Sequence, residues 1–430
     1  MSLFGALDTA ISGLSSQSSA FGNIGDNIAN SQTTGFKRVD TSFLDYLTTS
    51  TQTDNQPGAV VAVPLYVNTV QGTIAQTDNP LALAISGQGF FTVSQADTTG
   101  SGSPTFSAQP LYTRDGNFQL NAAGYLVNDS GGYLNGWAVQ PNGQVDTTTL
   151  QPIQVSQQVY APVATSTMTL AANLPPGGSL NSAGAQVPIA SNVSVYDAQG
   201  QSHQLSLAFT SAGAGSNNWS VAVTDDKGNT IGTGTLTFAA DGTLASVTQG
   251  GVTQSTSGQQ GTLTLNTVYP VSGGGTQTIA LDLGSIGGTS GLTQFAGSTY
   301  SLGGISQNGV APGQFSSISM QSNGDVVVNY DNGQARTIAQ VPVTTFPAPD
   351  ALQRQNNANY TATIDSGAGT AQAAGNNGAG TLVTSALEQS SVDIASEFSQ
   401  LIIAQQAYSA NAKTVTTADT MMQATLSMIQ

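Results

Sequence analysis

The chain carries very little charge. Only 7% of its 430 residues are Asp, Glu, Lys or Arg, against roughly 25% in an ordinary globular protein. Twenty-three acids outnumber seven bases, which gives a formal net charge of -16. Only Lys37 and Arg38 are adjacent bases. A basic stripe that could follow a phosphate backbone or an anionic lipid surface is therefore missing, and we expect no nucleic acid as a partner.

The residues on which much enzyme chemistry depends are scarce. Cysteine is absent, which excludes disulfides, thiolate nucleophiles and cysteine-bound metals. His203 is the only histidine, so a histidine-based triad or a two-histidine metal site cannot be built. The alternating residues around it predict that His203 is a half-exposed strand residue. Residues 86–91 and 225–229 partly resemble a dinucleotide-binding loop and a calcium-binding loop, respectively, and we interpret both as turns. We predict no catalytic, cofactor-binding or metal site, and no enzyme.

Long apolar runs are also missing. No stretch approaches the roughly 20 residues that a membrane-spanning helix needs, so we expect no membrane insertion. The first basic residue is Lys37, and the charged start of a cleavable secretory signal is therefore absent. If the protein leaves the cell, we expect it to keep its N-terminus.

Both chain ends have apolar residues at helical spacing. From Leu7 onward such residues recur every seven positions, and from Leu387 onward the same repeat continues over about six heptads. A helix of about 45 residues would extend roughly 65 Å. The predicted self-assembly seam comprises Leu7, Ile11, Leu14, Phe21, Ile28, Leu387, Ile394, Phe398, Leu401, Tyr408, Val415, Met422 and Ile429.

These seams admit two interpretations. A short apolar stripe usually packs on the core of its own domain. Here, however, the faces beside the stripes are nearly free of charge, which is unusual for a long helix that faces water. We therefore favour burial of both seams against neighbouring copies, with the ends poorly ordered in a free monomer and helical after assembly.

The middle of the chain, from about Leu65 to Tyr360, reads as β structure. Short alternating segments are separated by Asp-Gly and Asn-Gly turns. Shifts in composition indicate an inserted β domain, and residues 367–380 read as a flexible linker. We expect a mainly β fold with terminal α-helices and nested, sandwich- or barrel-like β domains, divided into a terminal helical core (1–30 and 383–430), connectors (31–70 and 361–382), an inner β domain (71–159 and 298–360) and an outer inserted β domain (160–297).

One local string is more specific than these patterns. Residues 26–37 read Asp-Asn-Ile-Ala-Asn-Ser-Gln-Thr-Thr-Gly-Phe-Lys, which resembles the N-terminal signature of the bacterial flagellar rod and hook proteins. Residues 387–393 and 401–413 resemble the matching C-terminal end, and residues 79–85, 87–91 and 112–118 resemble inner segments. The signature residues are Asn27, Asn30, Thr33, Thr34, Gly35, Phe36 and Lys37.

The resemblance implies a function. Members of this family polymerise, and the two ends would form coiled-coil-like helices lining a hollow tube. The inserted β domain resembles that of hook subunits, so we expect a homopolymer that forms the short curved hook, a universal joint passing torque from rod to filament. It further implies type III export to the extracellular flagellum, and contacts with the rod, the hook cap and the hook-filament junction proteins. The alternatives are a distal rod subunit or, from another class, a secreted glycan-binding β protein with exposed aromatic platforms.

Overall fold

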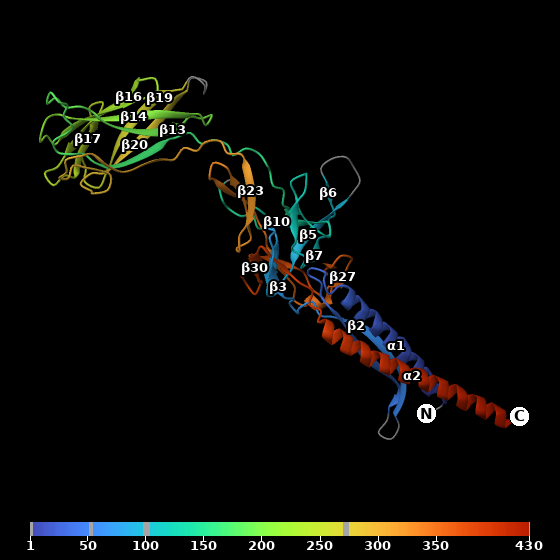
Figure 1. The fold of residues 1–430 in the computed structure, drawn as a ribbon. Helices are drawn as coiled ribbons and strands as arrows, with labels where there is room; N and C mark the ends of the chain where they lie inside the picture. Colours follow the sequence, from blue (N-terminus) through green and yellow to red (C-terminus); the bar gives the residue numbers. More distant parts are fainter. Residues whose placement is uncertain (1–2, 51–54, 98–103, 141, 270–274, 430) are drawn as a thin grey trace. The chain divides into compact units, whose positions relative to one another are not determined.

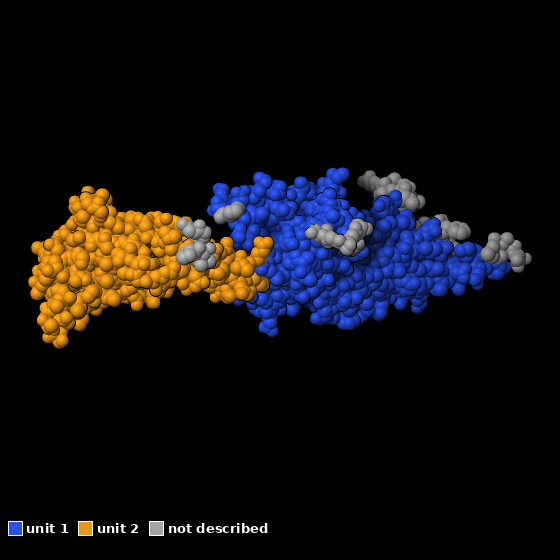
Figure 2. All heavy atoms as spheres, turned by 90° about the horizontal axis from the view of Figure 1, so that it is seen from above, with its two compact units in different colours: residues 1–157, 316–329, 335–430 blue, residues 158–315, 330–334 orange. Residues whose placement is uncertain are grey.

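The computed structural model describes residues 3–50, 55–97, 104–140, 142–269 and 275–429. The chain forms two compact units, which Figure 2 colours separately. Unit 1 combines residues 1–157, 316–329 and 335–430, and unit 2 combines residues 158–315 and 330–334. Unit 1 is therefore assembled from segments far apart in the sequence, whereas unit 2 is almost continuous.

Two helices of unit 1 pack against each other. Helix α1 spans Leu3–Ala29 and helix α2 spans Ile394–Ile429, and the two lie side by side in Figure 1. The seven-residue repeat predicted a helix already at Leu387, and this is wrong. Leu387 lies in strand β31 (Ala386–Glu388), which pairs with strand β3 (Ile74–Gln76). Asp393 starts α2 instead, because its Oδ1 accepts the backbone N–H groups of Ala395 and Ser396.

A long hairpin lies along α1. Strands β1 (Val39–Ser50) and β2 (Asn55–Tyr66) pair antiparallel and both contact α1. Side-chain hydroxyls of the helix bond the backbone of β2: Ser16 donates to the Val60 carbonyl at 2.8 Å, and Ser12 accepts the Val60 N–H at 3.1 Å. The uncharged face of α1, which we expected to meet neighbouring helices, thus covers a strand edge of its own chain.

Most of unit 1 is β structure. Its largest sheet has the strand order β23-β24-β25-β10-β5-β7-β28-β27, with β6, β8, β9 and β11 attached at the sides. Small two-stranded sheets, β30 with β4 and β26 with β29, join its C-terminal segment to its inner strands. The strands are β4 Leu83–Ser86, β5 Phe91–Asp97, β6 Thr105–Phe106, β7 Leu111–Thr113, β8 Phe118–Leu120, β9 Leu126–Asn128, β10 Gly132–Ala138, β11 Gln151–Pro152, β23 Phe315–Met320, β24 Asp325–Tyr330, β25 Ala335–Gln340, β26 Val343–Thr345, β27 Gln353–Arg354, β28 Asn359–Thr361, β29 Thr370–Gln372 and β30 Thr381–Thr384, with one 3-10 turn at Pro349–Ala351.

Unit 2 is a two-sheet structure around one apolar core. One sheet has the order β13-β14-β15-β16-β17-β18, and the other has β19-β20-β12-β21 with β22 on β12. Alternate residues of both sheets, including Leu205, Trp219 and Leu281, share the core. The strands are β12 Thr167–Asn173, β13 Ile189–Tyr196, β14 Ser202–Ser211, β15 Asn218–Thr224, β16 Thr230–Phe238, β17 Leu244–Gln249, β18 Val252–Gln254, β19 Gln260–Val268, β20 Thr276–Ser285, β21 Leu292–Thr293 and β22 Ser301–Gln307.

The predicted fold class, mainly β with a helix at each end, is confirmed. The limits of the β region are broader than predicted, because β1 begins at Val39 and β31 ends at Glu388. The Gly- and Asn-rich segment 367–380, expected to be a linker, contains β29, which pairs with β26. The domain limits expected from the sequence stay a prediction.

Candidate functional site: a buried charge hub that joins both chain ends

Three charged side chains meet inside unit 1. Lys37 follows α1, Arg114 follows β7, and Glu388 ends β31. Lys37 Nζ lies 2.5 Å from Glu388 Oε1, and Arg114 Nη1 lies 2.8 Å from Glu388 Oε2. All three side chains are almost completely buried. We call these residues the charge hub.

Further hydrogen bonds support the charge hub. Lys37 Nζ donates to the Val70 carbonyl at 2.6 Å, and the Gly72 N–H donates to Glu388 Oε1 at 2.8 Å. Arg114 Nη2 donates to the Gly87 carbonyl at 2.7 Å. Burial lowers the pKa of Lys37, an effect that the Glu388 carboxylate opposes and the Arg114 charge reinforces. Because two cations share one carboxylate, removal of Glu388 would leave both buried charges unpaired.

Gly35 brings the signature segment against Arg114. Its φ of +68° is one that side chains rarely adopt, and a Cβ there would lie 2.6 Å from the backbone carbon of Arg114 and the nitrogen of Asp115. The Gly35 N–H donates to the Glu388 carbonyl oxygen at 2.8 Å. Glycine is therefore required by both the backbone conformation and the close approach.

The other signature residues shape the exit from α1. Asn27 is buried; its side chain donates to the Val39 carbonyl at 3.0 Å and accepts the Val39 N–H at 2.9 Å. Asn30 bonds back to Asp26, and Thr33 donates to Asn30 Oδ1 at 3.1 Å. Thr34 is half-buried in the turn that follows.

The aromatic ring of the signature is held by a cation. The guanidinium carbon of Arg354 lies 4.3 Å from the centroid of the Phe36 ring, within the range of a cation–π contact. Arg354 Nη1 also pairs with Asp26 Oδ2 at 3.1 Å. Strand β27, which ends at Arg354, is thereby tied to the end of α1 and to the buried segment beyond it.

Asp115 adds an unusual carboxyl next to the charge hub. Burial raises the pKa of Asp115 to about 6, with the nearby Asp129 adding to the effect and the Asn117 N–H opposing it. Asn117 in turn donates to Asp129 Oδ2 at 2.7 Å. The loop after β7 therefore holds a carboxyl group that titrates within the range of mild acidity.

The residues of the predicted seam have mixed environments. Phe21 and Tyr408 make an edge-to-face contact between α1 and α2, with ring centroids 6.1 Å apart. Leu7, Leu14, Ile28, Leu387, Leu401, Val415 and Met422 are half-buried, whereas Ile11, Ile394, Phe398 and Tyr408 are exposed. The side chain of Ile429 lies outside the described side chains. A Cβ on Gly13 would lie 2.7 Å from the Asn411 amide, so this glycine allows the two helices to approach closely.

Sequence reasoning missed several residues of this site. Glu388 was read as part of a helix, and Arg114 as part of a hairpin motif. One compositional feature could have pointed to Glu388, because Glu388 and Glu397 are the only glutamates of the chain. Both are buried. A charged residue type that occurs twice, close together in a chain otherwise poor in charge, indicates a specific role.

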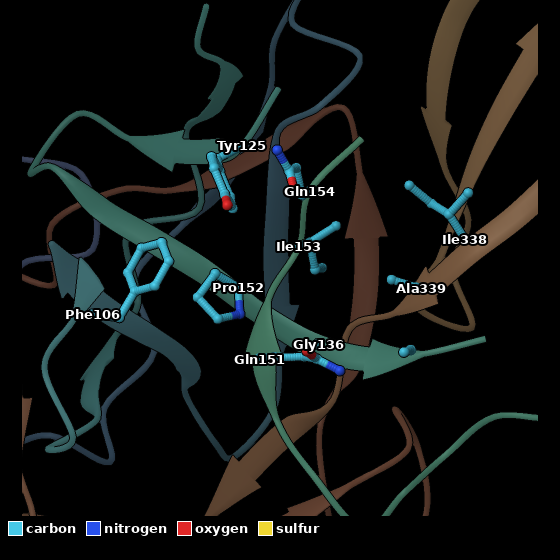
Figure 3. A pocket seen from close by; sticks show the side chains of 10 residues that line it. Phe106, Tyr125, Gly136, Gln151, Pro152, Ile153, Gln154, Ile338 and Ala339 are labelled. Atoms are coloured by element: carbon cyan, nitrogen blue, oxygen red, sulfur yellow. The ribbon is translucent and has the colours of Figure 1, made fainter. Parts of the chain in front are cut away.

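The remaining candidate sites carry no evident chemistry. His203 lies in strand β14 and is half-buried, as predicted; its ring stacks on Tyr269, and its Nδ1 lies 2.9 Å from Asp226 Oδ2. A hollow of about 400 Å³ in unit 1 is lined by aromatic, aliphatic and amide side chains (Figure 3). Among the described residues, no cluster of three metal-ligating side chains occurs, and no described helix is long and apolar enough to cross a membrane.

Four family models match successive parts of the chain. Residues 7–37 match the flagella basal body rod protein, and residues 84–169 match the flagellar hook protein FlgE/F/G D1 domain. Residues 181–310 match the flagellar basal body protein FlaE D2 domain. Residues 383–428 match the flagellar basal body rod FlgEFG protein C-terminal region.

Similar proteins align over nearly the whole chain. The flagellar hook protein FlgE of Brucella abortus is 30% identical over 415 residues, which cover 96% of each chain. That of Escherichia coli is 31% identical over 438 residues, covering 96% of this chain and 97% of the relative. That of Treponema pallidum is 29% identical over 477 residues, covering 98% and 99%. This chain therefore belongs to the flagellar hook protein family and is a structural subunit of the flagellar hook.

Proposed function

We propose that copies of this chain polymerise through α2 and the β1–β2 hairpin into the hollow, curved tube of the hook, which acts as a universal joint between rod and filament. The observation that carries this proposal is an apolar surface of α2 that the rest of the described chain does not cover. Ile394, Phe398 and Ile402 follow one another at four-residue spacing and are 41%, 51% and 54% exposed. They form one stripe on the helix.

The hairpin presents a second uncovered apolar surface. Phe43 and Leu44 are exposed on opposite faces of β1, and Val61 is exposed beside Leu44 on β2. Of the described strands, only β2 pairs with β1. A two-stranded ribbon is marginally stable by itself in water. These side chains are already about half covered, so each one that a second copy covers contributes about 1 kcal/mol. Both surfaces thus favour contact with further copies.

The nearly uncharged surface suits a joint that bends as it turns. Neighbouring subunits in a curved tube must exchange contacts during rotation. Exchange of one neutral hydrogen bond for another changes the free energy little, since the net contribution of each is about 0.5–1.5 kcal/mol. On this proposal the subunit is exported through the type III apparatus, meets the rod and the junction proteins at the ends of the hook, and catalyses no reaction.

The test replaces the stripe and leaves the fold intact. We expect the double variant Phe398→Ser/Ile402→Ser to remain folded and to lose polymer formation in a sedimentation assay. Val252→Ser, at an apolar residue in unit 2 that is even more exposed, serves as the matched control and should polymerise normally. A double variant that sediments like the unaltered chain would contradict the proposal.

Electron microscopy of the polymer separates the alternatives. A curved tube supports the hook joint, and a straight stiff tube supports a rod.

Deletion of residues 1–30 or 395–430 should leave a soluble β protein that no longer forms tubes. The glycan-binding alternative required exposed aromatic platforms, but Trp137 and Trp219 are 5% and 1% exposed.

A further inference from the structure

The only two glutamates of the chain lie nine positions apart and have different partners. Both carboxylate oxygens of Glu388 face cations within the charge hub. Glu397, in the first turn of α2, is 2% exposed. Its Oε1 accepts one hydrogen bond, from Asn27 Nδ2 at 3.2 Å, and its Oε2 is buried without a partner among the described residues. Ionisation of a buried carboxyl group with so few partners is disfavoured.

A cation with an unused donor lies in the same neighbourhood. Arg38 Nη2 pairs with Asp40 Oδ2 at 3.3 Å at the start of β1, while Arg38 Nε is buried without a partner in the described part of the chain. The backbone N–H of Arg38 donates to Ser391 Oγ at 3.2 Å, six positions before Glu397. The junction therefore holds an unpaired donor on a cation and an unpaired acceptor on a carboxyl group.

We propose that Glu397 is a protonation-dependent latch at the junction of α1, β1 and α2, which is neutral when it rests on Asn27 and, once ionised, takes Arg38 from Asp40. In the neutral state the Asn27 amide of α1 donates one N–H to the Val39 carbonyl of β1 and the other to Glu397 Oε1 of α2. In the ionised state Arg38 turns inward and neutralises the carboxylate. The first turn of α2 is then bound to Arg38 at the entry of β1 instead of to Asn27 of α1.

The charges around Glu397 agree with the neutral state. Burial raises the pKa of Glu397, the Asp40 and Asp393 charges add to this effect, and the Asn27 hydrogen bond and the Arg38 charge oppose it. The charged groups acting on Glu397 are therefore Arg38 and Asp40 from β1 and its entry, and Asp393 from the start of α2. Arg38 is the one that could compensate ionisation.

The low glutamate content makes a direct test possible. In the full chain labelled with ¹³C at the glutamate side-chain carboxyl, two resonances are expected, and Glu397→Gln identifies one by its loss. Between pH 4 and pH 8 the Glu397 signal should titrate with a midpoint above the ordinary value of about 4.3. In Arg38→Gln the Glu397 midpoint should rise by about one pH unit, a tenfold change in proton affinity.

Two controls keep the outcome decisive. Arg336→Gln removes an exposed arginine of β25 and should leave the Glu397 midpoint unchanged. If Arg38→Gln does not fold, Asp40→Asn frees Arg38 and should lower the Glu397 midpoint.

A second measurement follows Arg38 directly. The chain has four arginines, so the Nε–H resonance of Arg38 can be followed. It should become slow to exchange above the Glu397 midpoint, and not in Glu397→Gln. An ordinary Glu397 midpoint, or one that neither Arg38→Gln nor Asp40→Asn moves, would overturn the proposal.

Discussion

At the scale of single residues, we expect the stability of unit 1 to depend on a few buried charges. Four of the seven basic residues, Lys37, Arg38, Arg114 and Arg354, lie around the exit from α1. Two of them share the Glu388 carboxylate. In a chain with so few charges, this concentration identifies the region where both chain ends are fixed to the β structure.

Glu388→Gln tests this dependence. The substitution leaves Lys37 and Arg114 buried without a counter-charge, and we expect unit 1 to lose about 3–5 kcal/mol of its free energy of unfolding. Each unit contains one tryptophan, Trp137 in unit 1 and Trp219 in unit 2. Urea unfolding followed by Trp137 fluorescence in a Trp219→Phe background therefore reports unit 1. A loss below about 1 kcal/mol would show that the charge hub is not needed for stability.

Gly35→Ala tests the close approach of the signature turn. A side chain at φ +68° is strained, and its Cβ would also overlap the backbone at Arg114. Gly131→Ala is the matched control, because its φ is +79° but nothing lies within 4 Å of its Cβ position. We expect the control to cost about 1 kcal/mol from backbone strain alone and Gly35→Ala to cost at least about 2 kcal/mol more from overlap. Equal losses in urea unfolding would refute the packing argument.

Asp115 predicts a pH dependence of stability. Its pKa is about 6 in the folded chain against an ordinary value of 3.8 for a free side chain, so the folded state binds the extra proton between these values. The contribution to stability is fully present below about pH 4 and is lost as the pH rises through about 6, to a total of about 3 kcal/mol. Urea unfolding of unit 1 at pH 4 and pH 7 should show this decline, and Asp115→Asn should remove most of it. An unchanged pH profile in Asp115→Asn would exclude this group as the cause.

At the scale of elements, α1 acts partly as a neighbour for a strand edge. Ser16 and Ser12 bond the backbone carbonyl and N–H of Val60, respectively. These small uncharged residues of α1 therefore bind a strand of their own chain. We expect Ser12→Ala/Ser16→Ala to lower the protection of the Val60 amide in hydrogen exchange, by about 0.5–1.5 kcal/mol for each lost bond. Ser18→Ala, at an exposed position of the same helix, is the control. Unchanged protection of Val60 would mean that the hairpin is held by other contacts.

The elements also show what local patterns could and could not predict. The two helices and the strand-rich middle followed from apolar spacing and turn residues, because these depend on near neighbours in the sequence. The β1–β2 hairpin could not be predicted in this way. Phe43 and Leu44 are adjacent apolar residues on opposite faces of β1, so the strand lacks the alternation of apolar and polar residues. The start of α2 was placed too early because Leu387 continues the seven-residue repeat, although its backbone pairs with β3.

At the scale of the whole molecule, contacts between distant segments were beyond sequence reasoning. The signature at residues 26–37 and the motif at residues 112–118 were both noted from their resemblance, but their meeting point was not. Lys37 and Glu388 are 351 positions apart, and only the discontinuous path of unit 1 brings them together. The assembly role of the seam residues stays a prediction for the polymerisation assay.

This discontinuity predicts how the two units respond to truncation. A chain ending at residue 380 lacks β30, β31 and Glu388, which pair with β4, β3 and the two cations of the charge hub. We expect it to lose the cooperative unfolding transition reported by Trp137 and to keep that reported by Trp219, because unit 2 ends before this region. A chain ending at residue 393 keeps β31 and lacks only α2, and should retain both transitions. If the shorter chain kept the Trp137 transition, the C-terminal strands would be dispensable, and the charge hub would not be what completes unit 1.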